Sequence, residues 1–132
     1  MRYIMLICAD ESGVQALSPA EGEAMMAEYG KFGEEMTKRG VLETGERLRA
    51  TTDATTVSVR NGEVLTSDGP FAETKEQIGG YYVVNCKDLD EAISWAERIP
   101  SLAHYGAVEV RPLMEFDDAP AANGAAAEQA TS

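Results

Sequence analysis

The stretch SDGPFAETKEQIGGYYVVN, residues 67–85, joins a turn, a dense polar run and a strand, and the predicted fold is built outward from it. Asp-Gly-Pro at residues 68–70 favours a turn, because Asp accepts from backbone N–H groups while Gly and Pro fix the dihedral angles. The segment GYYVVNC, residues 80–86, is rich in aromatic and β-branched residues and predicts a strand. Its apolar residues occupy both alternating positions, so we expect both faces of this strand to be covered.

A β-hairpin is predicted directly before this stretch. The segments ATTVSVR (residues 54–60) and EVLTS (residues 63–67) flank Asn61-Gly62. This dipeptide is the strongest short hairpin signal, because both positions of a two-residue loop need positive φ. Further upstream, VLETGERL (residues 41–48) predicts another strand.

Two helices are marked by their capping residues. The sequence Ser-Pro-Ala-Glu at residues 18–21 supplies an N-cap, a proline at the first helical position and the Glu of a capping box, and Arg39-Gly40 predicts the end. Asp88, with Glu91 three residues later, caps a second helix that Pro100 ends.

Helical spacing of apolar residues predicts which faces of these helices point inward. The predicted inner positions are Met25, Tyr29, Phe32 and Met36 in the first helix and Ala92, Ile93, Ala96 and Ile99 in the second. Gly30 and Gly33 each cost about 1 kcal/mol relative to alanine inside a helix. We therefore expect them to permit close packing on a sheet.

The order of elements predicts the fold class. A strand at residues 2–8 opens the chain and a strand at residues 107–116 ends it, giving strand, helix, strand, hairpin, strand, helix, strand. Without the hairpin this order is βαββαβ, so we predict an α+β, ferredoxin-like sandwich of the dimeric α/β-barrel type with an inserted β-hairpin. Residues 1–116 are expected to form one domain, and the Ala-rich acidic residues 117–132 a disordered tail.

The apolar strands also predict assembly. In a ferredoxin-like sandwich both helices cover one face of the sheet and leave the other open. The first strand and the strand at residues 80–86 are nevertheless apolar at both alternating positions. We expect a homodimer that packs sheet to sheet. The alternative is that the inserted hairpin covers part of the open face instead.

Composition limits the classes of function. The 132 residues are 44% hydrophobic with a net charge of −12, and no basic patch is visible, which argues against nucleic acid or an anionic membrane as a partner. No run of about 18 apolar residues and no signal peptide is present, so we expect a cytoplasmic chain. No P-loop, dinucleotide fingerprint or metal-ligand spacing occurs, and we expect neither a metal nor a cofactor.

A resemblance adds to these expectations. The opening RYIMLICADE, the run DGPFAETKEQIGGYYVVNCKDLDEAISWAERIP and the ending GAVEVRPLMEF together resemble the YciI-related family in its DGPF branch, over residues 1–116. The resemblance implies a dimeric ferredoxin-like α+β protein. Some members have a cleft in which a His-Asp pair is assigned acid–base work, and one relative acts on a chlorinated hydroxyquinone. For the DGPF branch itself a biochemical function is mostly lacking.

The family histidine does not carry over to this chain. The resemblance places it in the first helix, about three turns before the terminating glycine, and that position falls near Tyr29. An unperturbed tyrosine pKa of about 10 makes a poor base near neutral pH. Tyr29 is a candidate ligand-binding residue. Alternatively, Tyr29 is packed in the core with its hydroxyl hydrogen-bonded within the protein.

Topology predicts where a site would lie. The end of the first strand, the start of the strand at residues 80–86 and the end of the second helix lie at the same end of the sheet. This gathers the ionisable candidates, which are Asp10, Asp68, Glu73, Lys75 and His104.

Roles can be assigned to these candidates. We predict Asp68 as a catalytic base and His104 or Lys75 as the acid or charge stabiliser. Asp10, Glu73, Lys75 and Arg111 are candidate ligand contacts. Structural alternatives remain open: Asp68 as a turn residue, AETKEQ as a solvated helical turn, His104 at the surface, and Arg111 in an ion pair or dimer contact.

Three classes of function follow. The first is a small-molecule enzyme of the lyase or isomerase type that uses these acid–base residues. The second is a non-catalytic regulatory dimer, since the DGPF branch resembles domains associated with alternative sigma factors. The third is an interaction module whose loop docks a protein.

The two cysteines test the topology. If the first strand and the strand at residues 80–86 are antiparallel neighbours, Cys8 and Cys86 lie at opposite ends of the pair, separated by roughly 15 Å. A disulfide needs Cα atoms within about 7 Å. We therefore expect two free thiols.

Overall fold

The structure is a computed structural model that describes residues 1–103 and 106–116. The predicted tail and His104 lie outside the described residues. The elements in chain order are β1 (Arg2–Asp10), α1 (Glu11–Gln15), α2 (Pro19–Lys38), β2 (Leu42–Arg47), η1 (Thr51–Asp53), β3 (Thr55–Arg60), β4 (Glu63–Asp68), β5 (Glu76–Asn85), α3 (Leu89–Ala96), η2 (Pro100–Ala103) and β6 (Ala107–Pro112).

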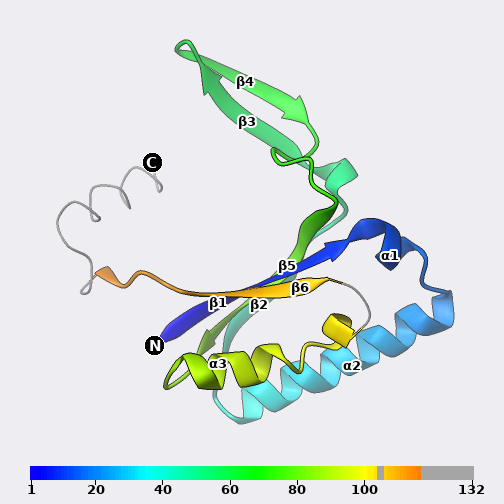
Figure 1. The fold of residues 1–132 in the computed structure, drawn as a ribbon, viewed down its shortest axis with the longest axis vertical. Coiled ribbons are helices and arrows are strands. Elements are labelled where there is room, and N and C mark those ends of the chain that lie inside the picture. Colours follow the sequence, from blue (N-terminus) through cyan, green and yellow to red (C-terminus); the bar gives the residue numbers. More distant parts are fainter. Residues whose placement is uncertain (104–105, 117–132) are drawn as a thin grey trace.

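Four strands form one antiparallel sheet in the order β2-β5-β1-β6. Helices α2 and α3 lie together on one side of this sheet, and the β3–β4 hairpin is a separate two-stranded sheet that stands away from it (Figure 1). Without the hairpin the chain is βαββαβ, so the predicted ferredoxin-like α+β fold with an inserted hairpin is confirmed.

The predicted helix N-caps and hairpin turn are confirmed by the structure. The Ser18 Oγ accepts from the Glu21 N–H at 3.1 Å while the Glu21 carboxylate accepts from the Ser18 N–H at 3.0 Å, which is a complete capping box. The Asp88 carboxylate accepts from the Glu91 N–H at 2.9 Å and begins α3. Asn61 and Gly62 have φ of 50° and 80°, the conformation that a tight hairpin turn requires.

The alternative of a helical turn at AETKEQ was wrong, because residues 69–75 make an irregular loop and β5 begins already at Glu76. The residues after β1 form the short helix α1, with Asp10 as its N-cap.

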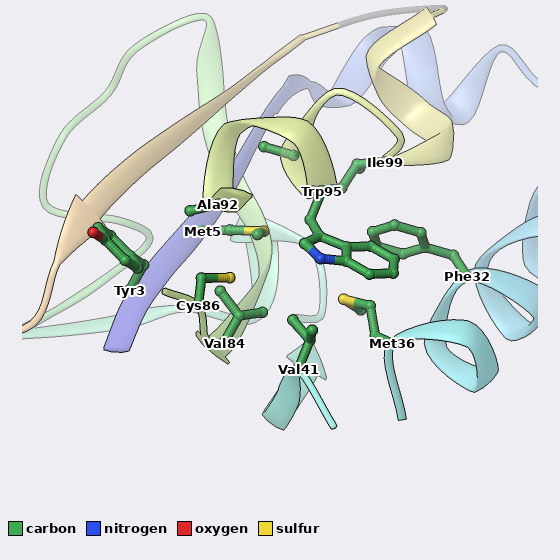
Figure 2. Close-up of a cluster of buried hydrophobic side chains, with 11 residues drawn as sticks. Tyr3, Met5, Phe32, Met36, Val41, Val84, Cys86, Ala92, Trp95 and Ile99 are labelled. Atoms are coloured by element: carbon green, nitrogen blue, oxygen red, sulfur yellow. The ribbon is translucent and has the colours of Figure 1, made fainter. Parts of the chain in front are cut away.

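The core lies between the sheet and the two helices. Its buried side chains are Tyr3, Met5, Phe32, Met36, Val41, Val84, Cys86, Ala92, Trp95, Ala96 and Ile99. Figure 2 shows Trp95 beside Phe32, and their ring centroids are 6.0 Å apart. The prediction of Ile93 as an inner residue was wrong: Ile93 is 39% exposed and Trp95 takes the inner position.

The expected role of the α2 glycines was also wrong. A Cβ placed on Gly30 or Gly33 would meet no atom within 4 Å, so neither glycine is needed for close packing within this chain. Close approach occurs instead at Gly45 in β2, where an added Cβ would lie 2.4 Å from the Tyr82 ring.

The second face of the sheet carries no helix. Tyr3 and Met5 of β1 point to the helices, and the residues between and beyond them therefore point away. Ile4 pairs with Val83, and Leu6 pairs with Tyr81, so these four side chains share the uncovered face. We call Ile4, Leu6, Tyr81 and Val83 the open face.

The strand register separates the two cysteines as predicted. Cys8 pairs with Ile78, whereas Cys86 follows Asn85, whose partner is Arg2 at the other end of β1. Both thiols are free, which confirms the prediction. Within the described residues no helix is long and apolar enough to cross a membrane.

The Cys86 thiol is expected to make stability depend on pH. Burial, together with the nearby Glu91 carboxylate, raises its pKa to about 11. Because the folded pKa lies above the unfolded value of about 8.5, the neutral thiol stabilises the fold at pH below 8.5, and this contribution is lost as pH rises toward 11. Urea unfolding should show a steeper loss of stability between pH 8.5 and 11 for the wild type than for Cys86→Ala. Parallel curves for the two proteins would contradict the raised pKa.

Candidate functional site

A pocket of about 390 Å³ lies where the end of β1, η1 and the β4–β5 loop (residues 69–75) meet. The residues that line it are Asp10, Glu11, Thr51, Pro70, Glu73, Thr74, Lys75 and Gln77. Its volume is within the range of about 300–1,000 Å³ typical of small-molecule sites. The lining is unusually polar, with Pro70 as its one apolar side chain, so the pocket suits a polar ligand.

Asp10 is held in its ionised form. Its carboxylate accepts from the Ser12 hydroxyl at 2.7 Å and from the Ser12 N–H at 3.0 Å, and the Lys75 ammonium lies 3.8 Å away. The Ser12 hydroxyl, then the Ser12 N–H and then the Lys75 charge lower the pKa of Asp10. A carboxylate with a lowered pKa is a weak base but a stable partner that can orient the lysine.

Glu11 fixes the wall of the pocket. Its two carboxylate oxygens accept from the Thr51 N–H at 2.8 Å and from the Thr51 hydroxyl at 2.7 Å. This bidentate contact joins α1 to η1 across a separation of 40 residues. Both carboxylate oxygens of Glu11 are therefore engaged by Thr51 rather than directed at a ligand.

Gln77 holds the β4–β5 loop in shape. Its side-chain amide donates to the Ala72 carbonyl at 2.6 Å and to the Thr74 carbonyl at 3.0 Å. The Thr74 hydroxyl in turn donates to the Glu76 carbonyl at 2.6 Å. These bonds set the positions of the two charged side chains between them, Glu73 and Lys75.

Glu73 is the one carboxylate of the pocket without a hydrogen bond or ion pair to any described residue. With three carboxylates and one ammonium, the lining carries a negative balance. A neutral or cationic ligand is therefore favoured over an anion.

The structure brings together three of the predicted site residues, Asp10, Glu73 and Lys75. Asp68 is the last residue of β4, exposed, and not among the residues that line the pocket. Strand β4 continues through Asp68 by pairing with Thr55, so this carboxylate belongs to the hairpin rather than to the loop. His104 lies outside the described residues.

Tyr29 and Arg111 lie elsewhere. Tyr29 packs against the core, and its hydroxyl is 2.6 Å from the Ser101 hydroxyl, in agreement with the alternative of a satisfied core tyrosine. Arg111 in β6 pairs with Ile4, which puts it beside the open face, and it forms an ion pair with Glu109.

Sequence reasoning missed Thr51, Thr74 and Gln77 as pocket residues. Thr51 is brought in only by its bonds to Glu11, a contact between distant segments that no local pattern announces. Gln77 belongs to a part of β5 that extends four residues before the predicted strand.

A second pocket of about 380 Å³ lies along residues 47–53 and is lined by Arg47, Leu48, Arg49, Ala50 and Asp53. The Arg49 guanidinium donates to the Asp53 carboxylate at 2.8 Å, which leaves less of its charge for a ligand. In the part of the chain that the structure describes, no three His, Cys, Asp or Glu side chains are grouped to hold a metal ion.

Comparison with known proteins places the chain in a family. A family model described as the YCII-related domain matches residues 1–117. The chain belongs to the YCII-related family. Among its relatives, the uncharacterized protein R00369 of Rhizobium meliloti (strain 1021) is 40% identical over 114 residues, which cover 86% of this chain and 92% of that protein.

A solved structure is a more distant likeness to this YCII-related chain. It is the 5-chloro-2-hydroxyhydroquinone dehydrochlorinase TftG from Burkholderia phenoliruptrix AC1100 in complex with 2,5-dihydroxybenzoquinone. The sequences are 13% identical, the TM-score is 0.46, and the alignment covers 91% of this chain and 100% of that chain. At this similarity the activity of TftG carries no argument about this chain.

Proposed function

We propose that this protein is a small-molecule-binding member of the DGPF branch of the YCII-related family, with lyase- or isomerase-type acid–base chemistry in the pocket beside the β4–β5 loop. The string DGPFAETKE at residues 68–76 supports the branch. The observation that carries the function is the meeting of Asp10, Glu73 and Lys75 in one polar pocket.

Each of the three has a distinct role. Glu73 has no described partner and is the base that removes a proton from a carbon next to a carbonyl group. Lys75 neutralises the negative charge that then develops on the carbonyl oxygen. Asp10, kept ionised by Ser12, orients the ammonium of Lys75. This assignment moves the base from Asp68 to Glu73 and keeps His104 as a candidate acid.

The remaining parts of the proposal concern assembly and location. The open face supports a homodimer that packs sheet to sheet. Residues 1–116 form the working domain, and the protein acts in the cytoplasm without a cofactor.

Glu73→Gln is expected to slow proton abstraction at least about 100-fold, because a positioned general base contributes about 10²–10⁴ to the rate. The assay is hydrogen–deuterium exchange at the carbon next to the carbonyl, followed by ¹H NMR in D₂O, over a panel of neutral hydroxylated ketones and aldehydes. Lys75→Met should slow the same exchange through loss of charge stabilisation.

Matched controls lie on α2, where Glu28 and Lys31 are exposed and away from the pocket. Glu28→Gln and Lys31→Met should exchange as the wild type does. Equal exchange rates for Glu73→Gln and Glu28→Gln would rule out Glu73 as the base.

A non-catalytic interaction dimer is the second candidate function. The exposed apolar side chains of the hairpin and Phe71 in the β4–β5 loop favour it. The exchange assay over the same panel of compounds distinguishes this function from catalysis. The interaction role is supported if the wild-type protein is dimeric but neither binds any of the compounds nor catalyses their exchange.

A further inference from the structure

The β3–β4 hairpin carries an apolar stripe on one face. We call residues 55–68 the arm. Val59 pairs with Val64, and Val57, two residues before Val59, lies on the same face. These three valines are 65%, 69% and 64% exposed, respectively. The opposite face carries two charged residues, one leucine and three small polar residues: Arg60, Glu63, Leu65, Thr56, Ser58 and Ser67.

The arm receives little support from its own chain. It forms a two-stranded sheet of its own. At its base the Gly69 N–H donates to the Ala54 carbonyl at 2.8 Å, and the Thr56 hydroxyl donates to the Gly69 carbonyl at 2.7 Å. A two-stranded hairpin alone is at best marginally stable in water. An exposed valine stripe on such an element is a candidate contact surface.

The position of the arm indicates what that surface is. The arm stands on the side of the four-stranded sheet away from α2 and α3 (Figure 1). That is the side of the open face, so the arm and the open face of one chain lie on the same side of the sheet.

We propose that the arm of each protomer packs its valine face on a second copy of this chain, whose open face lies on the first copy's open face. The inference rests on the homodimer proposed above and adds to it the contact of the arm.

The dimensions fit this arrangement. Each strand of the arm has six residues, and at about 3.4 Å per residue the arm is roughly 20 Å long. Two sheets packed face to face are about 10 Å apart. The arm is therefore long enough to pass the layer of the second copy's sheet and to lay its valines along that sheet's edge.

The areas fit a contribution of the arms to the interface. Three fully buried valines remove roughly 300 Å² from water, so two arms with the surfaces they meet would bury roughly 1,200 Å². A stable interface needs about 1,200–2,000 Å² in total. The arms therefore reach the lower end of this range, and the open faces extend the interface.

The test is sedimentation equilibrium of the full chain with the triple variant Val57→Thr/Val59→Thr/Val64→Thr. Threonine keeps the size and the strand preference of valine, so circular dichroism should show an unchanged fold. The dimer dissociation constant of the triple variant is expected to rise at least tenfold over the wild type. Leu65→Thr, on the other face of the arm, is the control and should dimerise as the wild type does.

Each outcome decides a separate point. A triple variant that dimerises as tightly as the wild type overturns the arm contact and leaves the homodimer standing. A wild-type monomer at tens of micromolar overturns both and leaves the arm to a different protein. Glu73 lies outside the arm, so the exchange assay on Glu73→Gln tests the pocket independently of either result.

Discussion

Gly106→Ala is expected to destabilise the fold by at least about 3 kcal/mol, because two unfavourable effects coincide at one residue. Gly106 has a φ of +92°, a conformation that L side chains rarely adopt. A Cβ at this position would also lie 2.0 Å from the Cys8 carbonyl oxygen and 3.0 Å from the Ala9 Cα. Both neighbours are backbone of the central strand β1 and cannot rotate away.

Urea denaturation measures this effect, with Gly30→Ala as the control. A Cβ on Gly30 meets nothing, and the helix gains about 0.5–1 kcal/mol from alanine. The two alanine substitutions should therefore have opposite signs. A Gly106→Ala protein within about 0.5 kcal/mol of the wild type, the range of ordinary surface substitutions, would show that β6 adjusts its start without cost.

Trp95→Ala is expected to cost about 3–5 kcal/mol, the usual range for removing a large buried aromatic side chain. Trp95 is 6% exposed, its ring packs against Phe32, and the Arg98 guanidinium carbon lies 4.8 Å from its centroid. Its removal takes away the side chain that joins α3 to α2.

The matched control lies two residues away on the same helix. Ile93→Ala should cost less than about 1 kcal/mol, because Ile93 is half-exposed and outside the core. Thermal or urea unfolding of both variants gives the comparison. Equal losses would mean that α3 presents a different face to the sheet.

Much of the fold followed from residues that act locally. The Ser18 capping box, the Asn61-Gly62 turn and the Asp88 cap each fix the backbone through neighbours within three residues, so their geometry can be derived without tertiary information. Which of Ile93 and Trp95 is buried could not be derived from local sequence. Both fit a helical stripe with Ala92 and Ala96, and Phe32 of α2 decides which one is buried.

The site was predictable to the extent that topology determines it. Strand order puts Asp10 at the end of β1 beside the start of β5, and therefore beside Glu73 and Lys75. Asp68 was misplaced because the pairing of β3 with β4 continues further than the turn sequence suggested. Thr51 was missed because only a long-range contact with Glu11 brings it to the pocket.

The order of strands in the sheet has a consequence for synthesis of the chain. Strand β1 is made first, yet both of its neighbours, β5 and β6, come from the second half of the sequence. At about 5–20 residues per second, β1 waits several seconds on the ribosome before β5 is complete. During this time α2 and the arm can form from local contacts, whereas β1 has apolar side chains on both faces and no partner strand. The nascent chain therefore exposes an apolar strand until β5 has been made, and chaperone capture should concentrate on residues 2–10.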